Sequence, residues 1–147
     1  MREEHVTKAI LQHLMDRGWI IVCYDFPQSG AGRALHPDSE MSKTRGIIVP
    51  DVVAVKDGIA LYLEDKDRYC YADYVKVHKV VGGNSYRQAF SDLLAGYAVR
   101  RMVCGIGMPV EAFVGEAVIN AALVDVVLGV DENGSVRRVY GGQRLPL

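Results

Sequence analysis

The segment VPDVVAVKDGIALYLEDKDR, residues 49–68, organises the rest of the chain, because it reads as two strands joined by a tight turn. Its Asp57-Gly58 pair separates two apolar runs, and Asp-Gly in this position is among the strongest short-range signals of a β-hairpin. The segment also places charged side chains among residues that favour burial. Charged groups are almost never fully buried unless they are paired or liganded, so this hairpin requires partners for them.

The register of the hairpin brings two acidic side chains together. With Asp57-Gly58 as a two-residue turn, counting outward along both strands places Asp51 directly opposite Glu64. Residues opposite each other share one face of the sheet, with Cβ atoms about 5 Å apart. Lys66 lies two positions beyond Glu64 and shares this face, whereas Asp65 points to the other face. We therefore expect three charged groups to converge at one end of the hairpin.

This arrangement predicts a metal site. Two carboxylates so close repel each other unless one takes up a proton or a cation lies between them. Mg²⁺ prefers oxygen ligands, keeps several waters and binds substrate phosphates, and we expect Mn²⁺ to substitute for it. Asp51 and Glu64 are the expected ligands, with the backbone carbonyl of Asp65 as a third. Such an ion polarises phosphoryl oxygens and generates hydroxide near neutral pH, while Lys66 orients water or stabilises charge on phosphate. The set predicts phosphodiester hydrolysis.

A second interpretation of the same residues involves no chemistry. Asp51 after Pro50 can simply open a strand, and residues 64–68 can be a solvated strand end with exposed ion pairs. The expected register is what this interpretation explains least well, because like charges directly opposite each other destabilise a sheet.

The whole chain has the composition of a single α/β domain covering residues 1–147. Half of the residues are hydrophobic and 24% are charged, which is typical of a globular protein. The net charge of −1 gives no overall cationic field, so any contact with nucleic acid must come from local basic patches. Cys23 and Cys104 lie in apolar runs and are expected to be reduced, buried thiols. No apolar run is long enough for a membrane span and the N-terminus is unlike a signal peptide, so we expect a cytoplasmic protein without a membrane partner.

The predicted elements follow the order α-β-β-β-α-β, with a helix and a hairpin added at the C-terminal end. Their ranges are a helix over 3–17, strands over 19–26, 46–55 and 59–66, a helix from 84 or 85 to about 99, a strand over 101–107, a helix over 110–123 and a hairpin over 124–140 that turns at Asn133-Gly134.

Pro50-Asp51 and Glu64-Asp65-Lys66, in this order of elements and after a helix carrying Glu3 and Glu4, resemble the PD-(D/E)xK nuclease superfamily. That superfamily includes type II restriction endonucleases and Holliday-junction resolvases. The resemblance covers roughly residues 1–106. It implies a restriction-endonuclease-like core, with a mixed central sheet flanked by helices.

By this resemblance Asp51 and Glu64 are metal ligands and Lys66 is the catalytic lysine. Members often add a glutamate from the first helix. On a helical wheel Glu3 falls at the centre of the apolar stripe and Glu4 about a quarter-turn from it, so we expect Glu3 to join the site and keep Glu4 as the alternative. Both residues can also simply favour the positive end of the helix dipole.

Two subfamilies compete. The first strand and hairpin are similar to archaeal-type junction resolvases, in which a serine after the first strand assists catalysis, and Ser29 occupies that place. The longer loop, the absence of a basic net charge and the C-terminal additions favour a small restriction endonuclease, which would act on double-stranded DNA as a homodimer or with a larger recognition subunit. A resolvase would instead cut branched DNA. A third interpretation is a non-catalytic domain that binds nucleic acid or a partner.

Candidate DNA contacts lie mainly in the polar loop 27–45 and in segment 68–79, where basic residues alternate with tyrosines that can stack on bases. The loop can equally be a solvated segment, and 68–79 an amphipathic connector. The candidates are Ser29, Arg33, Lys43, Arg45, Arg68, Lys76, Lys79 and Arg87.

Overall fold

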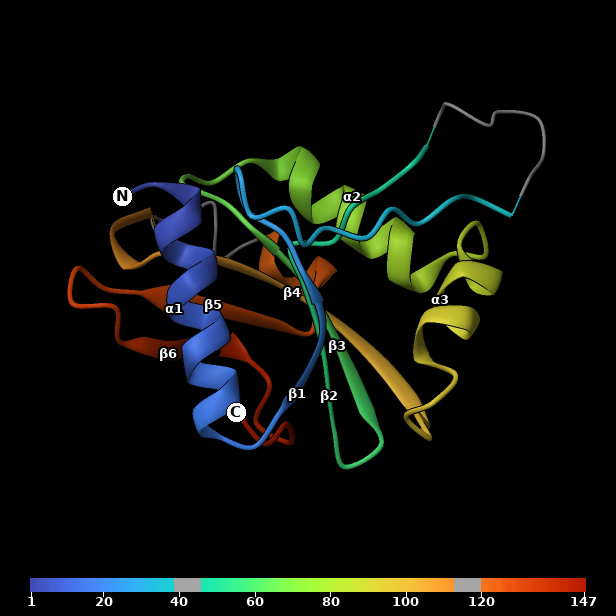
Figure 1. Ribbon diagram of the computed structural model, residues 1–147. Coiled ribbons are helices and arrows are strands. Elements are labelled where there is room, and N and C mark those ends of the chain that lie inside the picture. The colour runs from blue at the N-terminus through green and yellow to red at the C-terminus, as the bar shows by residue number, and fades with distance from the viewer. Residues whose placement is uncertain (39–45, 113–119) are drawn as a thin grey trace.

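The computed structural model describes residues 1–38, 46–112 and 120–147. Over these residues the fold is α/β, with three α-helices and a six-stranded mixed sheet that is not closed (Figure 1). None of the described helices has the length and apolar character needed to cross a membrane. The elements are α1 (Glu3–Asp16), β1 (Ile20–Tyr24), β2 (Val52–Lys56), β3 (Ile59–Asp65), α2 (Tyr71–Gly82), α3 (Arg87–Leu94), β4 (Arg101–Pro109), β5 (Val126–Val130) and β6 (Val136–Gly141), with 3-10 turns η2 (Val110–Ala112) and η3 (Asn120–Leu123).

The strands lie in the sheet in the order of the sequence, from β1 to β6. β1, β2 and β3 are antiparallel, β4 runs parallel to β3 and to β5, and β6 is antiparallel to β5. The change of direction at β4 follows from the connection through α2 and α3, because parallel strands need a crossover rather than a tight turn. α1 and α2 lie on opposite faces of the sheet (Figure 1).

The hairpin of β2 and β3 has the register expected from its turn. Lys56 pairs with Ile59 and Val52 with Leu63, so the next positions outward are Asp51 and Glu64. Asp57 and Gly58 both have positive φ, 51° and 77°, as the two central residues of a type I′ turn require. The Asp57-Gly58 turn therefore sets the register of the hairpin.

Two apolar clusters cover the two faces of the sheet. The cluster under α1 contains Ile10 and Leu14 with alternate residues of the strands, such as Leu61 and Leu63. The cluster under α2 and α3 contains the intervening strand residues, such as Tyr62. Because helices cover both faces, β3 is buried from its second residue to its last.

Several expected boundaries were wrong. The helix expected to reach about residue 99 ends at Leu94. Residues 71–82, for which we predict no helix from the sequence, form α2. Tyr74, Val77 and Val80 are the buried stripe of α2, a helical spacing that the neighbouring tyrosines and lysines obscured. Half of the helix expected over 110–123, residues 113–119, lies outside the described residues, and its described ends form the 3-10 turns η2 and η3.

Other expectations were confirmed. Cys23 and Cys104 are buried free thiols, whereas Cys70 is exposed. The C-terminal hairpin forms from β5 and β6, with Gly134 in its turn at a φ of 81°.

The C-terminal segment is attached to the body of the domain by Trp19, whose Nε1 donates a hydrogen bond of 2.8 Å to the Pro146 carbonyl.

Gly107 in β4 gives a test of this packing. A Cβ at this position would overlap the Asp65 carboxyl and the Ile10 side chain, so we expect Gly107→Ala to lower the free energy of unfolding by about 1–3 kcal/mol. Gly82→Ala is the matched control, because a Cβ there meets nothing within 4 Å. Urea unfolding followed by circular dichroism measures both, and equal midpoints for the two variants would contradict the described packing.

Candidate functional site

The candidate site lies where β2 begins and β3 ends. Lys66, the residue after β3, has its Nζ 3.7 Å from Glu3 Oε1 and 4.0 Å from Asp73 Oδ1. Since Glu3 opens α1 and Asp73 lies in the first turn of α2, the N-terminal ends of both helices meet this end of the sheet. Helices from opposite faces therefore frame the pair Asp51 and Glu64.

Asp51 is a half-buried carboxyl in a negative environment. It accepts a hydrogen bond of 2.7 Å from the backbone N–H of Asp65. Burial raises its pKa to about 7, and the charges of Glu64 and Glu3 act in the same direction, while the Asp65 N–H and Lys66 oppose them. The Asp51 carboxyl is therefore partly protonated near neutral pH unless a cation lies beside it.

Glu64 is almost fully buried and already has a counter-ion. Its carboxylate is 3% exposed and forms an ion pair through Oε1 with Nζ of Lys76 from α2. The Tyr62 hydroxyl donates to Oε2 at 3.5 Å. Lys76 was expected among the DNA contacts, and no pattern in its own segment indicates that it reaches this carboxylate.

Lys66 lies between carboxylates from three elements. Its partial burial by itself lowers the pKa, but Glu3, Glu64 and Asp73 together raise it above the ordinary value for lysine. Lys66 therefore keeps its proton at neutral pH, which suits a group that stabilises negative charge and not one that accepts a proton.

Asp65 has its side chain on the face of α1, as expected from strand alternation. Neither carboxyl oxygen has a hydrogen-bond partner among the described residues, and complete burial raises the pKa of this carboxyl well above its ordinary value, as does the charge of Asp51. The backbone N–H of Asp65 points to Asp51, and the carbonyl of a strand residue points to the same side as its N–H. The Asp65 carbonyl, which was expected as a metal ligand, thus points to the side of β3 on which Asp51 lies.

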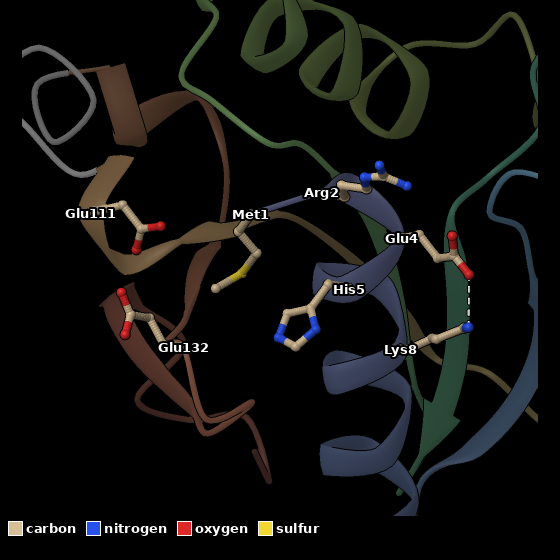
Figure 2. A pocket seen from close by; sticks show the side chains of 7 residues that line it. All are labelled: Met1, Arg2, Glu4, His5, Lys8, Glu111 and Glu132. Carbon is tan, nitrogen blue, oxygen red and sulfur yellow. Dashed lines mark ion pairs between the residues drawn. The ribbon is translucent and has the colours of Figure 1, made fainter.

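Of the two glutamates of α1, it is Glu3 that faces the site. It contacts Lys66, whereas Glu4 pairs with Lys8 at 2.7 Å. Figure 2 shows this second pair, which borders a separate cavity beside α1. The cavity has a volume of about 510 Å³. That cavity is lined by Met1, Arg2, Glu4, His5, Lys8, Glu111 and Glu132.

Asp25 is a further carboxylate here that the sequence reasoning missed. Its N–H donates to the Asp51 carbonyl at 2.9 Å, and both side chains line a cavity of about 250 Å³ together with Glu3 and Thr7. The Ser29 hydroxyl donates to Asp25 Oδ1 at 2.9 Å, so Ser29 reaches the site through Asp25. Pairing the first predicted strand with the hairpin would have revealed Asp25.

The remaining candidates for DNA contacts come from separate segments of the chain, and one of them, Arg68, lies two residues after Lys66. Lys43 and Arg45 lie outside the described residues. Arg87 donates to Asn84 Oδ1 at 2.6 Å. Among the described residues, no ion pair joins the carboxylates of the site to Arg33, Arg68, Lys79 or Arg87.

The groups present fit a hard divalent cation. Asp51 and Glu64 supply two carboxylates, and the Asp65 carbonyl supplies a third oxygen. In the part of the chain that the structure describes, no three His, Cys, Asp or Glu side chains lie close enough to enclose a metal ion. The donor set therefore suits Mg²⁺, which is held by one or two carboxylates and keeps water and phosphate oxygens, and does not suit the closed four-ligand site of structural zinc.

Comparisons of the chain with protein-family models and with curated proteins found no match. Inferences about its chemistry therefore rest on the residues of the site.

The raised pKa of Asp51 predicts a pH dependence of stability. Asp51 keeps its proton up to about pH 7 in the folded chain but has an ordinary pKa of 3.8 when unfolded. Between these values the folded state binds more protons, so the free energy of unfolding should fall as pH rises from about 4 to 7. Without divalent cations, we expect Asp51→Asn to be roughly 1–3 kcal/mol more stable than the wild type at pH 8 and equal to it near pH 4.

Urea unfolding in EDTA across this pH range tests the expectation. Asp57→Asn is the control, because Asp57 is exposed and Asn also tolerates its positive φ. If Asp51→Asn raises the free energy of unfolding at pH 8 no more than Asp57→Asn does, folding does not disfavour the ionised form of Asp51, and the expectation is wrong.

Proposed function

We propose that this protein is a metal-dependent endonuclease that hydrolyses phosphodiester bonds of DNA. The observation that carries the proposal is the position of Asp51 and Glu64, each one residue beyond the last β2–β3 pair and close enough for the Glu64 charge to raise the pKa of Asp51, beside a protonated Lys66. A site that gathers several carboxyl groups around the Lys66 ammonium suits a divalent ion and a phosphate, because the ion balances the carboxylates and the lysine attracts the phosphate.

The order of the elements supports placing the chain in the PD-(D/E)xK superfamily. Along the chain α1, β1, β2 and β3 are followed by two helices, α2 and α3, and then by β4, which is one helix more than the expected order. The only parallel step among these four strands is the one from β3 to β4. β5 and β6 extend the sheet beyond this core.

Each residue of the site has a role in the proposed hydrolysis. A divalent cation at Asp51 and Glu64 would polarise a phosphoryl oxygen and lower the pKa of a bound water. Lys66 keeps its positive charge and stabilises the negative charge that develops on the phosphate. Glu3 and Asp73 contact the Lys66 ammonium from opposite helices and so limit where it points.

A restriction endonuclease remains our first proposal for the biological role, acting on double-stranded DNA as a homodimer or with a larger recognition subunit. One contact favours branched DNA as a second candidate. Ser29, the counterpart of the serine of junction resolvases, is linked through Asp25 to the cavity that Asp51 lines.

Cleavage assays on a supercoiled plasmid and on a four-way junction test the proposal. We expect cleavage with Mg²⁺ or Mn²⁺, none with EDTA, and rates at least about 100-fold lower for Asp51→Asn and Lys66→Met. Lys56→Met, which removes the same charge at the turn end of the β2–β3 hairpin, the end opposite the site, should cleave like the wild type.

The products separate the candidate roles. Discrete linear plasmid fragments support a restriction enzyme, nicking alone supports a missing partner subunit, and cuts only in the junction support a resolvase. Binding of DNA without any cleavage would contradict a catalytic role and favour a binding domain.

A further inference from the structure

The pair formed by Lys76 and Glu64 is the feature of the site that the proposed hydrolysis does not use. Glu64 is 3% exposed, whereas the Lys76 side chain is 44% exposed. The Glu64 carboxylate accepts the Lys76 ammonium at Oε1 and the Tyr62 hydroxyl at Oε2. Both oxygens of a proposed metal ligand are therefore already engaged by groups of the protein.

A buried carboxylate needs such a partner when no metal ion is bound. Removing the counter-ion of a buried charge is strongly destabilising, because the remaining charge loses solvation without compensation. Lys66 does not fill this role, since its ammonium lies within ion-pair distance of Glu3 and Asp73. The charge of Glu64 is thus balanced by the side chain from α2.

The position of Lys76 allows its ammonium to move away from Glu64 while its backbone stays in place. Its neighbours Tyr74 and Val77 are buried in the face of α2 that packs on the sheet, so the helix holds the Lys76 backbone in place. The side chain itself lies at the surface and has four methylene groups, so its ammonium can leave Glu64 for water without a change in the helix.

We infer that Lys76 is the resident counter-ion of Glu64 and that a divalent cation takes its place. This inference rests on the proposed function. Glu64 keeps a positive partner in both states, which is Lys76 before metal binding and the cation afterwards. Lys76 is a positioning residue in this scheme, and it weakens metal binding by competing for the carboxylate.

Titration calorimetry of the full chain with Mn²⁺ measures the competition directly. We expect Lys76→Met to bind Mn²⁺ about tenfold more tightly than the wild type, because the ion no longer displaces an ammonium. Lys76→Arg keeps the ion pair and should bind like the wild type. Lys79→Met is the matched control for net charge, and its affinity should be unchanged.

A second measurement uses the unaltered protein. Acetylation of lysine amines, quantified by mass spectrometry, reports whether the Lys76 ammonium is engaged. We expect Mn²⁺ to increase labelling of Lys76 severalfold while labelling of Lys79 stays constant.

The outcomes separate this inference from the proposed function. Absence of Mn²⁺ binding in every variant would overturn both. Equal Mn²⁺ affinity in the wild type and Lys76→Met, with unchanged labelling of Lys76, would overturn the exchange alone. Weaker binding in Lys76→Met would also overturn it, because Lys76 would then support the metal site and not compete with it.

Discussion

The rest of the site depends on one electrostatic constraint, the closeness of two carboxylates that are both withdrawn from water. Asp51 and Glu64 occupy the next positions beyond the pair Val52 and Leu63, where their repulsion has to be balanced by a proton or a cation. Asp51 responds with a raised pKa and Glu64 with an ion pair. The repulsion between the two carboxylates is thus reduced by a proton on Asp51 and by the Lys76 ammonium at Glu64.

Charged residues gather at this end of the sheet because β3 ends there and α1 and α2 begin there. β3 carries Glu64 to the face of α2 and Asp65 to the face of α1. Gly107 leaves room for the Asp65 carboxyl on the neighbouring strand. A stable fold that buries carboxyl groups without full hydrogen bonding accepts a cost in stability, which is common where structure serves chemistry.

Sequence reasoning succeeded where the determining forces were local. The Asp57-Gly58 turn sets the register of its own hairpin, and the helical wheel separated Glu3 from Glu4 because it depends on a single helix. Sequence reasoning failed where the interacting residue lies on a distant segment of the chain. Lys76 reaches Glu64 only after α2 packs on the sheet, and Asp25 meets Asp51 only through strand pairing. Neither contact leaves a pattern in its own segment.

The hairpin also has a consequence for the order of folding. Its two strands are joined by a turn of two residues, so their pairing closes a small loop and can form early, whereas β4 pairs with β3 only after a long crossover. We therefore expect the two acidic residues to be brought together before α2 packs on the sheet. Packing of α2 is then favoured by the ion pair between Lys76 and Glu64 as well as by apolar contact.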